Sequence, residues 1–366
     1  MSEELLTGNV GDWSELYVFF HLLGSPYLMS CDRALHPIGT IVPVKAIYRG
    51  NDKEGNLLYT YNEVESNWDI SCNAIHICKV TQNTGKEEAK SLLKEMLTKG
   101  NGSMSSPKAE KFLRLLCDHK MKSLGKKEDI TLKINDVKAG QETITPFSIK
   151  SYIGSDPSLL NANKDGTNFL YEVTGINDKI YDLIQAEVEK HPRTCIVTLI
   201  KQLKRYKAEV IFRQLLNQTF EDNLQIIGLD APEFLAHLLL SHYMTGEHSV
   251  LENTKLVAEK NPFNLRKPTA YYNRAKKILQ AAAFGMTPSK EWDGLQIASG
   301  GFIIVKPNGE VVTYQRYDMD LIDNYLIEYT YFDHPSTSRH KYGKLFKGDD
   351  GRFYLKLAIQ IRFRKP

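Results

Sequence analysis

Hydrophobic residues recur at helical spacing near the start of the chain. Residues 13–23 place large apolar side chains on both faces of the expected helix, with Trp13 on one face and Phe19 on the other. A helix that is apolar nearly all round is buried in a larger core. Asp12, followed three residues later by Glu15, predicts a capping box at its start. Glu15 would then lie beside the core, where a carboxylate needs a partner or a metal ion.

The rest of the pattern predicts a mixed α/β (α+β) fold, with a mostly helical insertion between β-rich parts. Alternation of apolar and polar residues predicts strands, and 3.6-residue spacing predicts helices. Strands are expected at 41–48, 57–61, 74–80, 130–137, 146–153 and 168–173, and helices at 86–97 and 108–121. Residues 178–286 are mostly helical in pattern, whereas 302–314 predicts a hairpin and 354–363 a strand. We therefore expect either three parts, 1–177, 178–294 and 295–366, or one compact domain.

Composition places the chain among ordinary globular proteins. It has 366 residues, of which 42% are hydrophobic and 25% charged, which excludes a disordered tail or a small disulfide scaffold. The five cysteines form no Cys-x-x-Cys pair and fit a reducing cytoplasm. No apolar run approaches the ~20 residues of a membrane helix, and the first residues are acidic rather than signal-like. We expect a cytoplasmic protein with no membrane partner.

Positive charge is concentrated in three stretches, although the net charge is only +3. Residues 339–366 carry nine Lys or Arg against two Asp, and residues 190–213 carry seven against one Glu. Residues 262–277 carry five with no acid, and Tyr271 and Tyr272 lie among them. Such stretches commonly solvate a surface, but three of them together favour a polyanionic partner such as nucleic acid.

The candidate chemistry centres on the segment Phe147-Ser148-Ile149-Lys150-Ser151. On a strand, Phe147 and Ile149 would face the core, while Ser148 and Lys150 would share the opposite face. Asp136 lies near the end of the preceding strand, 14 residues before Lys150. A carboxylate that binds Mg²⁺ and a nearby lysine are the minimum apparatus for metal-dependent phosphodiester hydrolysis. The same two residues also fit a solvated lysine and an unrelated carboxylate.

Several longer blocks resemble one family. They are residues 8–15 (GNVGDWSE), 17–20 (YVFF), 147–151 (FSIKS), 159–163 (LLNAN), 167–169 (TNF) and 335–340 (PSTSRH). In this order they resemble the HpaII family of type II restriction endonucleases. The blocks extend from residue 8 into the C-terminal part, and only the region from about 180 to 290 matches by helical character alone.

The resemblance implies a PD-(D/E)xK nuclease core, in which a central sheet is flanked by helices. It also implies Mg²⁺-dependent cleavage of double-stranded DNA at a short palindrome, expected to be CCGG, that leaves 5′-phosphate and 3′-hydroxyl ends. A palindromic target with two scissile strands suggests a homodimer, and a cognate DNA methyltransferase is expected to protect host sites.

The sequence departs from the superfamily pattern at the second metal ligand. Ser148 stands where an Asp or Glu is usual, and Asn135 rather than proline precedes Asp136. Either Asp136 and the backbone carbonyl of Ile149 hold one metal ion, or another carboxylate completes the site. Glu15 is the first candidate and Glu172 the second. Lys150 is expected to position water and stabilise charge at phosphorus.

DNA contacts are expected from two loops and one helix. Arginine is the usual bidentate reader of guanine, and amides and hydroxyls contact backbone or bases, although the same residues also build turns. The candidates are Asn161, Asn163, Thr167, Asn168, Tyr271, Arg274, Ser336, Thr337, Ser338, Arg339, His340 and Lys341.

Two other functions fit the same residues. A nuclease with this core could repair mismatches or resolve branched DNA, and a non-catalytic regulator could bind DNA without cutting it. The sequence contains no phosphate-binding glycine loop and no nucleophilic-serine elbow, so ATP-driven and acyl-transfer chemistry are disfavoured.

Overall fold

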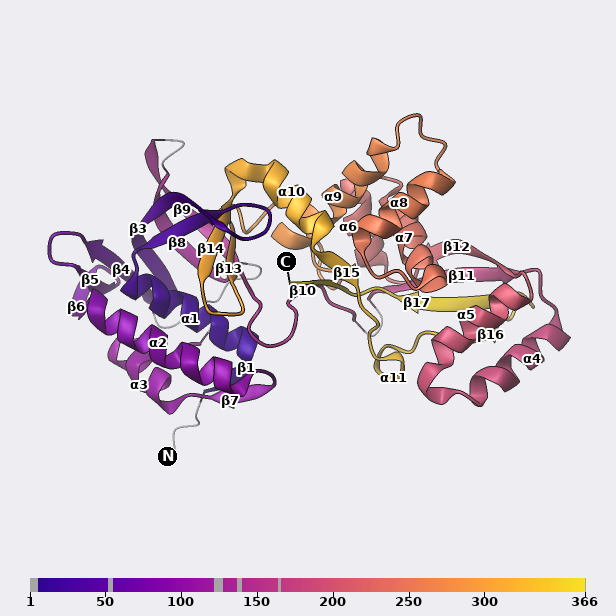
Figure 1. Ribbon diagram of the computed structural model, residues 1–366, viewed down its shortest axis with the longest axis horizontal. Helices are drawn as coiled ribbons and strands as arrows, with labels where there is room; N and C mark the ends of the chain where they lie inside the picture. The colour runs from indigo at the N-terminus through magenta and orange to yellow at the C-terminus, as the bar shows by residue number, and fades with distance from the viewer. Residues whose placement is uncertain (1–5, 52–54, 122–127, 137–139, 164–165, 366) are drawn as a thin grey trace. The chain divides into compact units, whose positions relative to one another are not determined.

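The chain forms two compact units. The structure is a computed structural model that describes residues 6–51, 55–121, 128–136, 140–163 and 166–365. Unit 1 consists of Met1–Pro157, Gln296–Ile322 and Lys365–Pro366, and unit 2 of Ser158–Leu295 and Asp323–Arg364. Both units combine helices with sheets (Figure 1), which confirms the predicted mixed α+β class.

Unit 1 is built on a nine-stranded sheet of order β2-β14-β13-β9-β8-β3-β4-β5-β6. Its elements are β1 (Thr7–Asn9), α1 (Val10–Gly24), β2 (Tyr27–Cys31), β3 (Pro37–Asn51), β4 (Gly55–Asn62), β5 (Asn67–Cys72), β6 (Ile75–Thr81), α2 (Gln82–Lys99), β7 (Ser103–Ser105), α3 (Pro107–Leu115), β8 (Ile130–Asp136), β9 (Gln141–Ser151), β13 (Gly301–Val305) and β14 (Val311–Gln315). Helices α1, α2 and α3 lie together against the sheet (Figure 1). The early strands and the hairpin at 302–314 occur where the sequence predicts them.

The C-terminal part of the chain contributes to the first sheet. β13 pairs in parallel with β9, so that Ile304 lies beside Lys150, and β14 follows β13 as an antiparallel partner. A parallel connection needs a long crossover, and unit 2 is inserted within it. The two units therefore differ from the predicted division, in which residues 295–366 form a separate part.

Helix α1 is buried as its apolar pattern predicts. Trp13 and Phe19 are both 0% exposed, and the helix packs into a core shared with the inner strands of the sheet. Its capping box differs from the prediction. Asn9 is the N-cap and Asp12 its partner, because each side chain accepts a hydrogen bond from the backbone N–H of the other. The helix thus begins at Val10, and Glu15 is not part of the cap.

Unit 2 contains two smaller sheets and most of the helices. Its elements are β10 (Ser158–Leu160), β11 (Asn168–Thr174), α4 (Asp178–Glu189), α5 (Cys195–Arg205), β12 (Glu209–Leu215), α6 (Gln218–Ile227), α7 (Ala231–Thr245), α8 (Val250–Lys260), α9 (Thr269–Phe284), β15 (Thr330–Phe332), α11 (Thr337–His340), β16 (Leu345–Lys347), β17 (Phe353–Ala358) and β18 (Ile361–Phe363). The sheets have the orders β12-β11-β17-β16 and β10-β18-β15. Helix α10 (Met319–Glu328) begins in unit 1 and ends in unit 2.

Three elements differ from the sequence prediction. β12 interrupts the region predicted as helical, because it pairs antiparallel with β11. The strand predicted at 354–363 is divided, since β17 pairs with β11 whereas β18 pairs with β10 and β15. Helix α3 ends at Leu115 instead of residue 121, and Cys117 beyond it has a left-handed φ of +58°.

The helices of the described residues are short or polar compared with a membrane span. No single helix among them is long and apolar enough to span a bilayer. Helices α6 and α7 are long and apolar enough only when taken together, and the chain bends by 105° between them.

Candidate active site

The centre of the site is the end of strand β9. Phe147 and Ile149 are buried in the core of unit 1, at 0% and 8% exposure. Ser148 and Lys150 share the other face, and the Lys150 Nζ donates a hydrogen bond to the Ser148 Oγ over 2.7 Å. The predicted alternation of this strand is confirmed. The Lys150 ammonium also lies 3.4 Å from the Ile149 carbonyl oxygen and 5.9 Å from the centroid of the Phe302 ring.

A carboxylate that the sequence analysis did not select completes this cluster. The Oδ2 of Asp129 accepts hydrogen bonds from the Ser148 hydroxyl at 3.1 Å and from the Ile149 backbone N–H at 2.5 Å. Its own N–H donates to the Phe147 carbonyl over 2.9 Å. Asp129 lies immediately before β8, so the β8–β9 pairing delivers it to Ser148 and Lys150.

Asp136 lies at the opposite end of the same hairpin. The antiparallel register pairs Asp136 with Gln141, next to the turn, whereas Ile130 pairs with Phe147 near the site. Lys150 lies nine positions after Gln141 on β9, a distance of about 30 Å at ~3.4 Å per residue. The register therefore does not bring Asp136 to Lys150. Asp129 instead contacts Ser148, to which Lys150 also donates a hydrogen bond.

The two other candidate carboxylates, Glu15 and Glu172, lie in different units. Glu15 lies on α1 directly after Ser14, whose hydroxyl is 2.7 Å from the Ser151 Oγ, one residue past Lys150. This contact joins α1 to the C-terminal end of β9. Glu172 lies in unit 2 on β11, where it is buried and paired with Arg213 at 2.6 Å. The Arg213 partner satisfies the Glu172 charge within unit 2.

The donor set suits a hard cation. Carboxylate and backbone carbonyl oxygens are the ligands that Mg²⁺ prefers. In a strand the N–H and C=O of one residue face the same neighbour, so the Ile149 carbonyl lies on the edge that Asp129 occupies. Both hydrogen bonds to the Asp129 carboxylate fall on Oδ2, and Oδ1 makes none with the described residues. A carboxylate oxygen and a carbonyl oxygen are thus placed beside an ammonium group.

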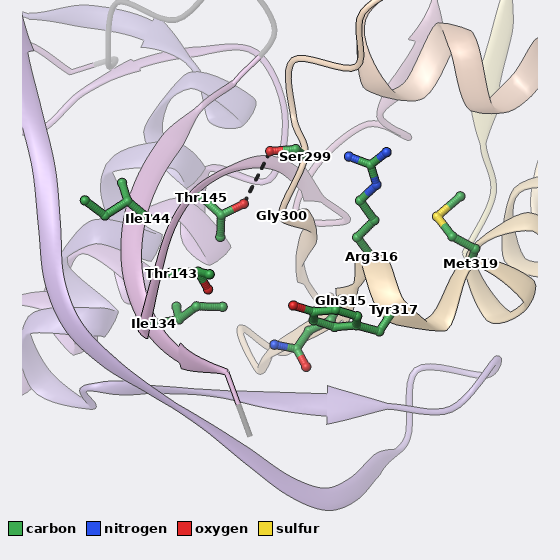
Figure 2. Close-up of a pocket in the computed structure, with 10 residues that line it drawn as sticks. All are labelled: Ile134, Thr143, Ile144, Thr145, Ser299, Gly300, Gln315, Arg316, Tyr317 and Met319. Carbon is green, nitrogen blue, oxygen red and sulfur yellow. Dashed lines mark hydrogen bonds between the residues drawn. The ribbon is translucent and has the colours of Figure 1, made fainter. Parts of the chain in front are cut away.

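A separate cavity of about 360 Å³ lies elsewhere in unit 1. Figure 2 shows Thr143 and Thr145 of β9 on one side of it and Arg316 and Met319 from the segment after β14 on the other. Neither Asp129 nor Lys150 lines this cavity. A DNA backbone binds along the protein surface, so the candidate active site does not need this cavity to bind its substrate.

The two predicted DNA-contact loops lie together in unit 2. The Asn168 Nδ2 donates to the His340 carbonyl over 3.2 Å, which joins the segment after β10 to α11. Ser336 caps α11 by accepting the Arg339 N–H at 3.4 Å. Lys164 and Asp165, within the first loop, are outside the described residues. The exposed candidates on this surface, which we call the loop surface, are Asn161, Asn163, Ser336, Ser338, Arg339 and Lys341.

Three of the other predicted DNA-contact residues are buried inside unit 2. Thr167 is 0% exposed and its hydroxyl closes the loop through the Asn163 backbone. Asn168 and His340 are buried as well, and burial together with the neighbouring Arg339 lowers the pKa of His340. These three side chains support the loop surface from the protein interior and are not exposed on it. Thr337, at the start of α11, is half-buried.

Tyr271 and Arg274 are also engaged within unit 2. Tyr271 is 1% exposed, and its hydroxyl donates to the Asn261 Oδ1 over 2.7 Å. Arg274 forms an ion pair with Asp230 and lies over the Phe263 ring at 5.3 Å. The expected phosphate contact of Tyr271 is therefore not supported, because its hydroxyl is used inside the protein.

Comparisons with known proteins identify the family of this chain. The family model described as HpaII restriction endonuclease matches residues 9–363. The type II restriction enzyme HpaII of Haemophilus parainfluenzae is 31% identical over 375 residues, covering 98% of this chain and 99% of that enzyme. No solved structure matches. The chain is thus a type II site-specific DNA endonuclease, a class that is generally metal-dependent. It belongs to the HpaII restriction endonuclease family.

Membership in this family decides between the functions left open by the sequence. A restriction endonuclease acts on DNA and cuts it, so the non-catalytic regulator and the repair nuclease are both set aside.

Proposed function

We propose that this endonuclease hydrolyses double-stranded DNA with Mg²⁺ at a short palindrome, expected to be CCGG, and leaves 5′-phosphate and 3′-hydroxyl ends. The observation that carries the proposal is the cluster of Asp129, Ser148 and Lys150 at the end of the β8–β9 hairpin. In this proposal the site is of the PD-(D/E)xK type, with the carboxylate supplied by Asp129 instead of Asp136 and with Ser148 at the second acidic position.

The metal would be held by Asp129 and the Ile149 carbonyl. When bound, Mg²⁺ lowers the pKa of a coordinated water and offsets negative charge at phosphorus. Glu15 is the candidate for a further carboxylate, because the contact of Ser14 with Ser151 places its helix beside the end of β9. Glu172 is not proposed for this role, since Arg213 neutralises it in unit 2.

Lys150 would position the attacking water and stabilise the transition-state charge. Its ammonium donates to Ser148, which donates in turn to Asp129. This chain of hydrogen bonds restricts the lysine, which is half-buried between the serine and the Phe302 ring. Preorganised donors of this kind contribute more than mobile ones because they need no reorganisation during the reaction.

DNA recognition would fall to the loop surface of unit 2. Arg339 is exposed on α11 and suits a bidentate contact to guanine. Ser336, Ser338, Asn161 and Asn163 offer hydroxyl and amide groups to backbone or bases. Because a palindrome presents two equivalent half-sites, a two-fold homodimer would cut both strands. A partner methyltransferase is proposed to protect the same sites in the host.

Cleavage of unmethylated plasmid DNA tests the proposal. We expect discrete fragments with Mg²⁺, none with EDTA, and ends that map to CCGG. Lys150→Ala should abolish cleavage yet retain DNA binding. The matched control is Lys133→Ala, since Lys133 lies on the same hairpin but pairs with Glu142 near the turn. Fragments at another sequence would contradict the CCGG assignment alone, and cleavage by Lys150→Ala would contradict the site.

A further inference from the structure

Three histidines from separate segments of unit 2 converge. His242 lies in the last turn of α7, His248 in the loop before α8, and His334 just after β15. The ring centroids are 4.7 Å apart for His242 and His334, 4.8 Å for His242 and His248, and 5.2 Å for His248 and His334. One ring nitrogen from each lies within 4.8 Å of the others. We call these three residues the histidine cluster.

Hydrogen bonds fix the tautomers of two of these rings. The Nδ1 of His242 is 2.7 Å from the Glu247 carbonyl oxygen, and the Nδ1 of His248 is 2.8 Å from that of Phe332. Since a carbonyl can only accept, each Nδ1 donates, and in the neutral ring Nε2 is left with its lone pair. A backbone carbonyl on the remote nitrogen is the usual second-shell partner of a metal-binding histidine.

His242 has an unsatisfied polar atom in the interior. Its side chain is 0% exposed, and its Nε2 has no hydrogen-bond partner among the described residues. A buried polar atom without a partner costs about 1–3 kcal/mol. A metal ion shared with His248 and His334 would satisfy this lone pair.

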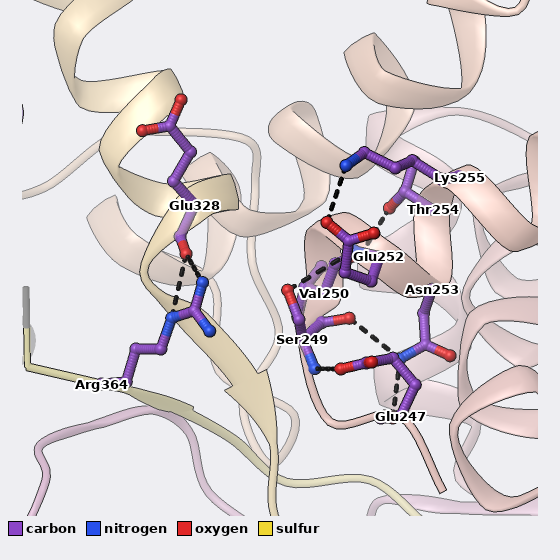
Figure 3. A network of polar contacts seen from close by, with 9 residues as sticks. All are labelled: Glu247, Ser249, Val250, Glu252, Asn253, Thr254, Lys255, Glu328 and Arg364. Atoms are coloured by element: carbon purple, nitrogen blue, oxygen red, sulfur yellow. Dashed lines mark hydrogen bonds and ion pairs between the residues drawn. The ribbon is translucent and has the colours of Figure 1, made fainter. Parts of the chain in front are cut away.

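The loop that carries His248 is held in place before any ion binds. Figure 3 shows the Ser249 N–H donating to the Glu247 carboxylate and the Asn253 amide donating to the carbonyls of Glu247 and Ser249. The His248 carbonyl in turn accepts the Phe332 N–H at 2.8 Å. The loop and the end of β15 are thus joined, and His248 is placed beside His334.

The ligand atoms of the histidine cluster are imidazole nitrogens. A neutral imidazole binds a metal ion through the ring nitrogen that carries the lone pair. The nearby carboxylate of Asp333 is paired with Arg362 at 2.7 Å, so the donor set is three nitrogens.

We propose that the histidine cluster binds one Zn²⁺ ion that cross-links α7, the α7–α8 loop and the segment after β15. Imidazole nitrogen suits zinc, whereas Mg²⁺ prefers oxygen, so this site is chemically distinct from the one at Asp129. Three histidines leave a fourth tetrahedral position for water. If the loop surface binds DNA as proposed above, the ion also steadies α11, which follows His334 by two residues.

Zinc binding by the full chain tests this inference without measuring cleavage. Metal-free protein is titrated with Zn²⁺ against a chromophoric chelator, and Co²⁺ is used as a spectroscopic substitute. We expect one Zn²⁺ per chain, the absorption bands of four-coordinate Co²⁺, a higher melting temperature with Zn²⁺, and no displacement by excess Mg²⁺. Lys150→Ala should bind Zn²⁺ equally, which separates this result from the fate of the proposed catalytic site.

Variants decide whether the cluster is the ligand set. His248→Ala and His334→Ala remove exposed rings and should each lower zinc affinity at least tenfold and abolish the Co²⁺ bands. His237→Ala is the matched control, because His237 lies on α7 beside Phe263 and outside the cluster. The inference is overturned if the unaltered protein binds no stoichiometric Zn²⁺, or if His334→Ala binds it as tightly as His237→Ala.

Discussion

The Asp129 carboxylate accepts the backbone N–H of Ile149 at 2.5 Å, although β8 begins only at Ile130. The last backbone pair of the two strands is Ile130 with Phe147. Beyond it, the side chain of Asp129 takes the place of the missing backbone acceptor. The hydrogen bond from the Ile149 N–H therefore fixes the Asp129 carboxylate beside the residue that precedes Lys150. The same hydrogen bond sets the direction of the second carboxylate oxygen.

Asp129→Asn is expected to lower the cleavage rate by at least about 10²-fold, the scale at which a preorganised charged group acts. The amide removes the negative charge that would hold Mg²⁺ and keeps the side-chain shape. Rates are measured on plasmid DNA with Mg²⁺, and DNA affinity is measured without it. Asp136→Asn is the matched control and should cleave within about twofold of the unaltered enzyme. The reverse ranking of the two variants would refute the assignment.

Ser148→Ala is expected to slow cleavage by about 3–10-fold, because one net hydrogen bond is worth about 0.5–1.5 kcal/mol. The Ser148 hydroxyl links Lys150 to Asp129 but carries no charge. Single-turnover kinetics should show a lower rate constant with unchanged DNA affinity. A loss as large as that of Lys150→Ala would mean that Ser148 does more than position its neighbours.

The β8–β9 hairpin shows which parts of the site can be predicted from the sequence. The alternation of Phe147, Ser148, Ile149 and Lys150 predicts the two faces of β9 correctly. The register is a feature of the structure: it pairs Asp136 with Gln141 and Ile130 with Phe147, which brings Asp129 to Ser148. The sequence predicts Asp136 as the metal-binding carboxylate because it lies near the end of its strand, and that prediction does not take the register of the hairpin into account.

Longer-range features are less accessible from the sequence. The sequence pattern from residue 178 onward predicts helices and does not reveal β12. This segment is a strand because it pairs with β11. Similarly, β13 returns to β9 across an intervening unit. The histidine cluster shows no local spacing, because His242, His248 and His334 meet only after α7 and β15 have packed. Tertiary pairing, not local propensity, decides all three.

Arg339→Ala is expected to reduce sequence discrimination by about 1–3 kcal/mol, the value of one bidentate guanine contact. The ratio of affinities for a CCGG duplex and a duplex with one altered base is measured without Mg²⁺, so that no cleavage occurs. Arg205→Ala, an exposed arginine at the end of α5, is the control and should leave this ratio unchanged. An unaltered ratio for Arg339→Ala would remove Arg339 from base recognition.

A buried ion pair in unit 1 makes a prediction about stability. Arg49 on β3 and Asp118 after α3 are each 4% exposed and 2.5 Å apart, and the Arg49 guanidinium lies 4.5 Å from the Phe19 ring centroid. Asp118→Ala leaves a buried charge without its partner, so we expect a loss of about 3–5 kcal/mol in urea unfolding.

The exposed pair of Lys347 and Asp178 provides the comparison, since both side chains are partly solvated. Asp178→Ala should cost less than about 1 kcal/mol. Equal costs for Asp118→Ala and Asp178→Ala would show that burial does not set the value of the Arg49 pair.

His21 predicts how stability depends on pH. Burial within α1 lowers the pKa of His21 from 6.5 to about 4, so the folded chain keeps the ring neutral where the unfolded chain protonates it. The unfolded state therefore binds more protons between pH 6.5 and 4, and stability falls as the pH drops through this window. The slope from this group is at most about 1.4 kcal/mol per pH unit. His21→Gln should lack this contribution.

Urea unfolding at pH 7, 6 and 5 measures the effect as the difference between the unaltered chain and His21→Gln. His76→Gln is the control, because His76 is exposed on β6 and an exposed imidazole loses little hydration on folding. We expect the gap between the unaltered chain and His21→Gln to narrow as the pH falls, with no such change for His76→Gln. Parallel curves for the unaltered chain and His21→Gln would show that His21 is protonated equally in both states and that its burial does not oppose the charge.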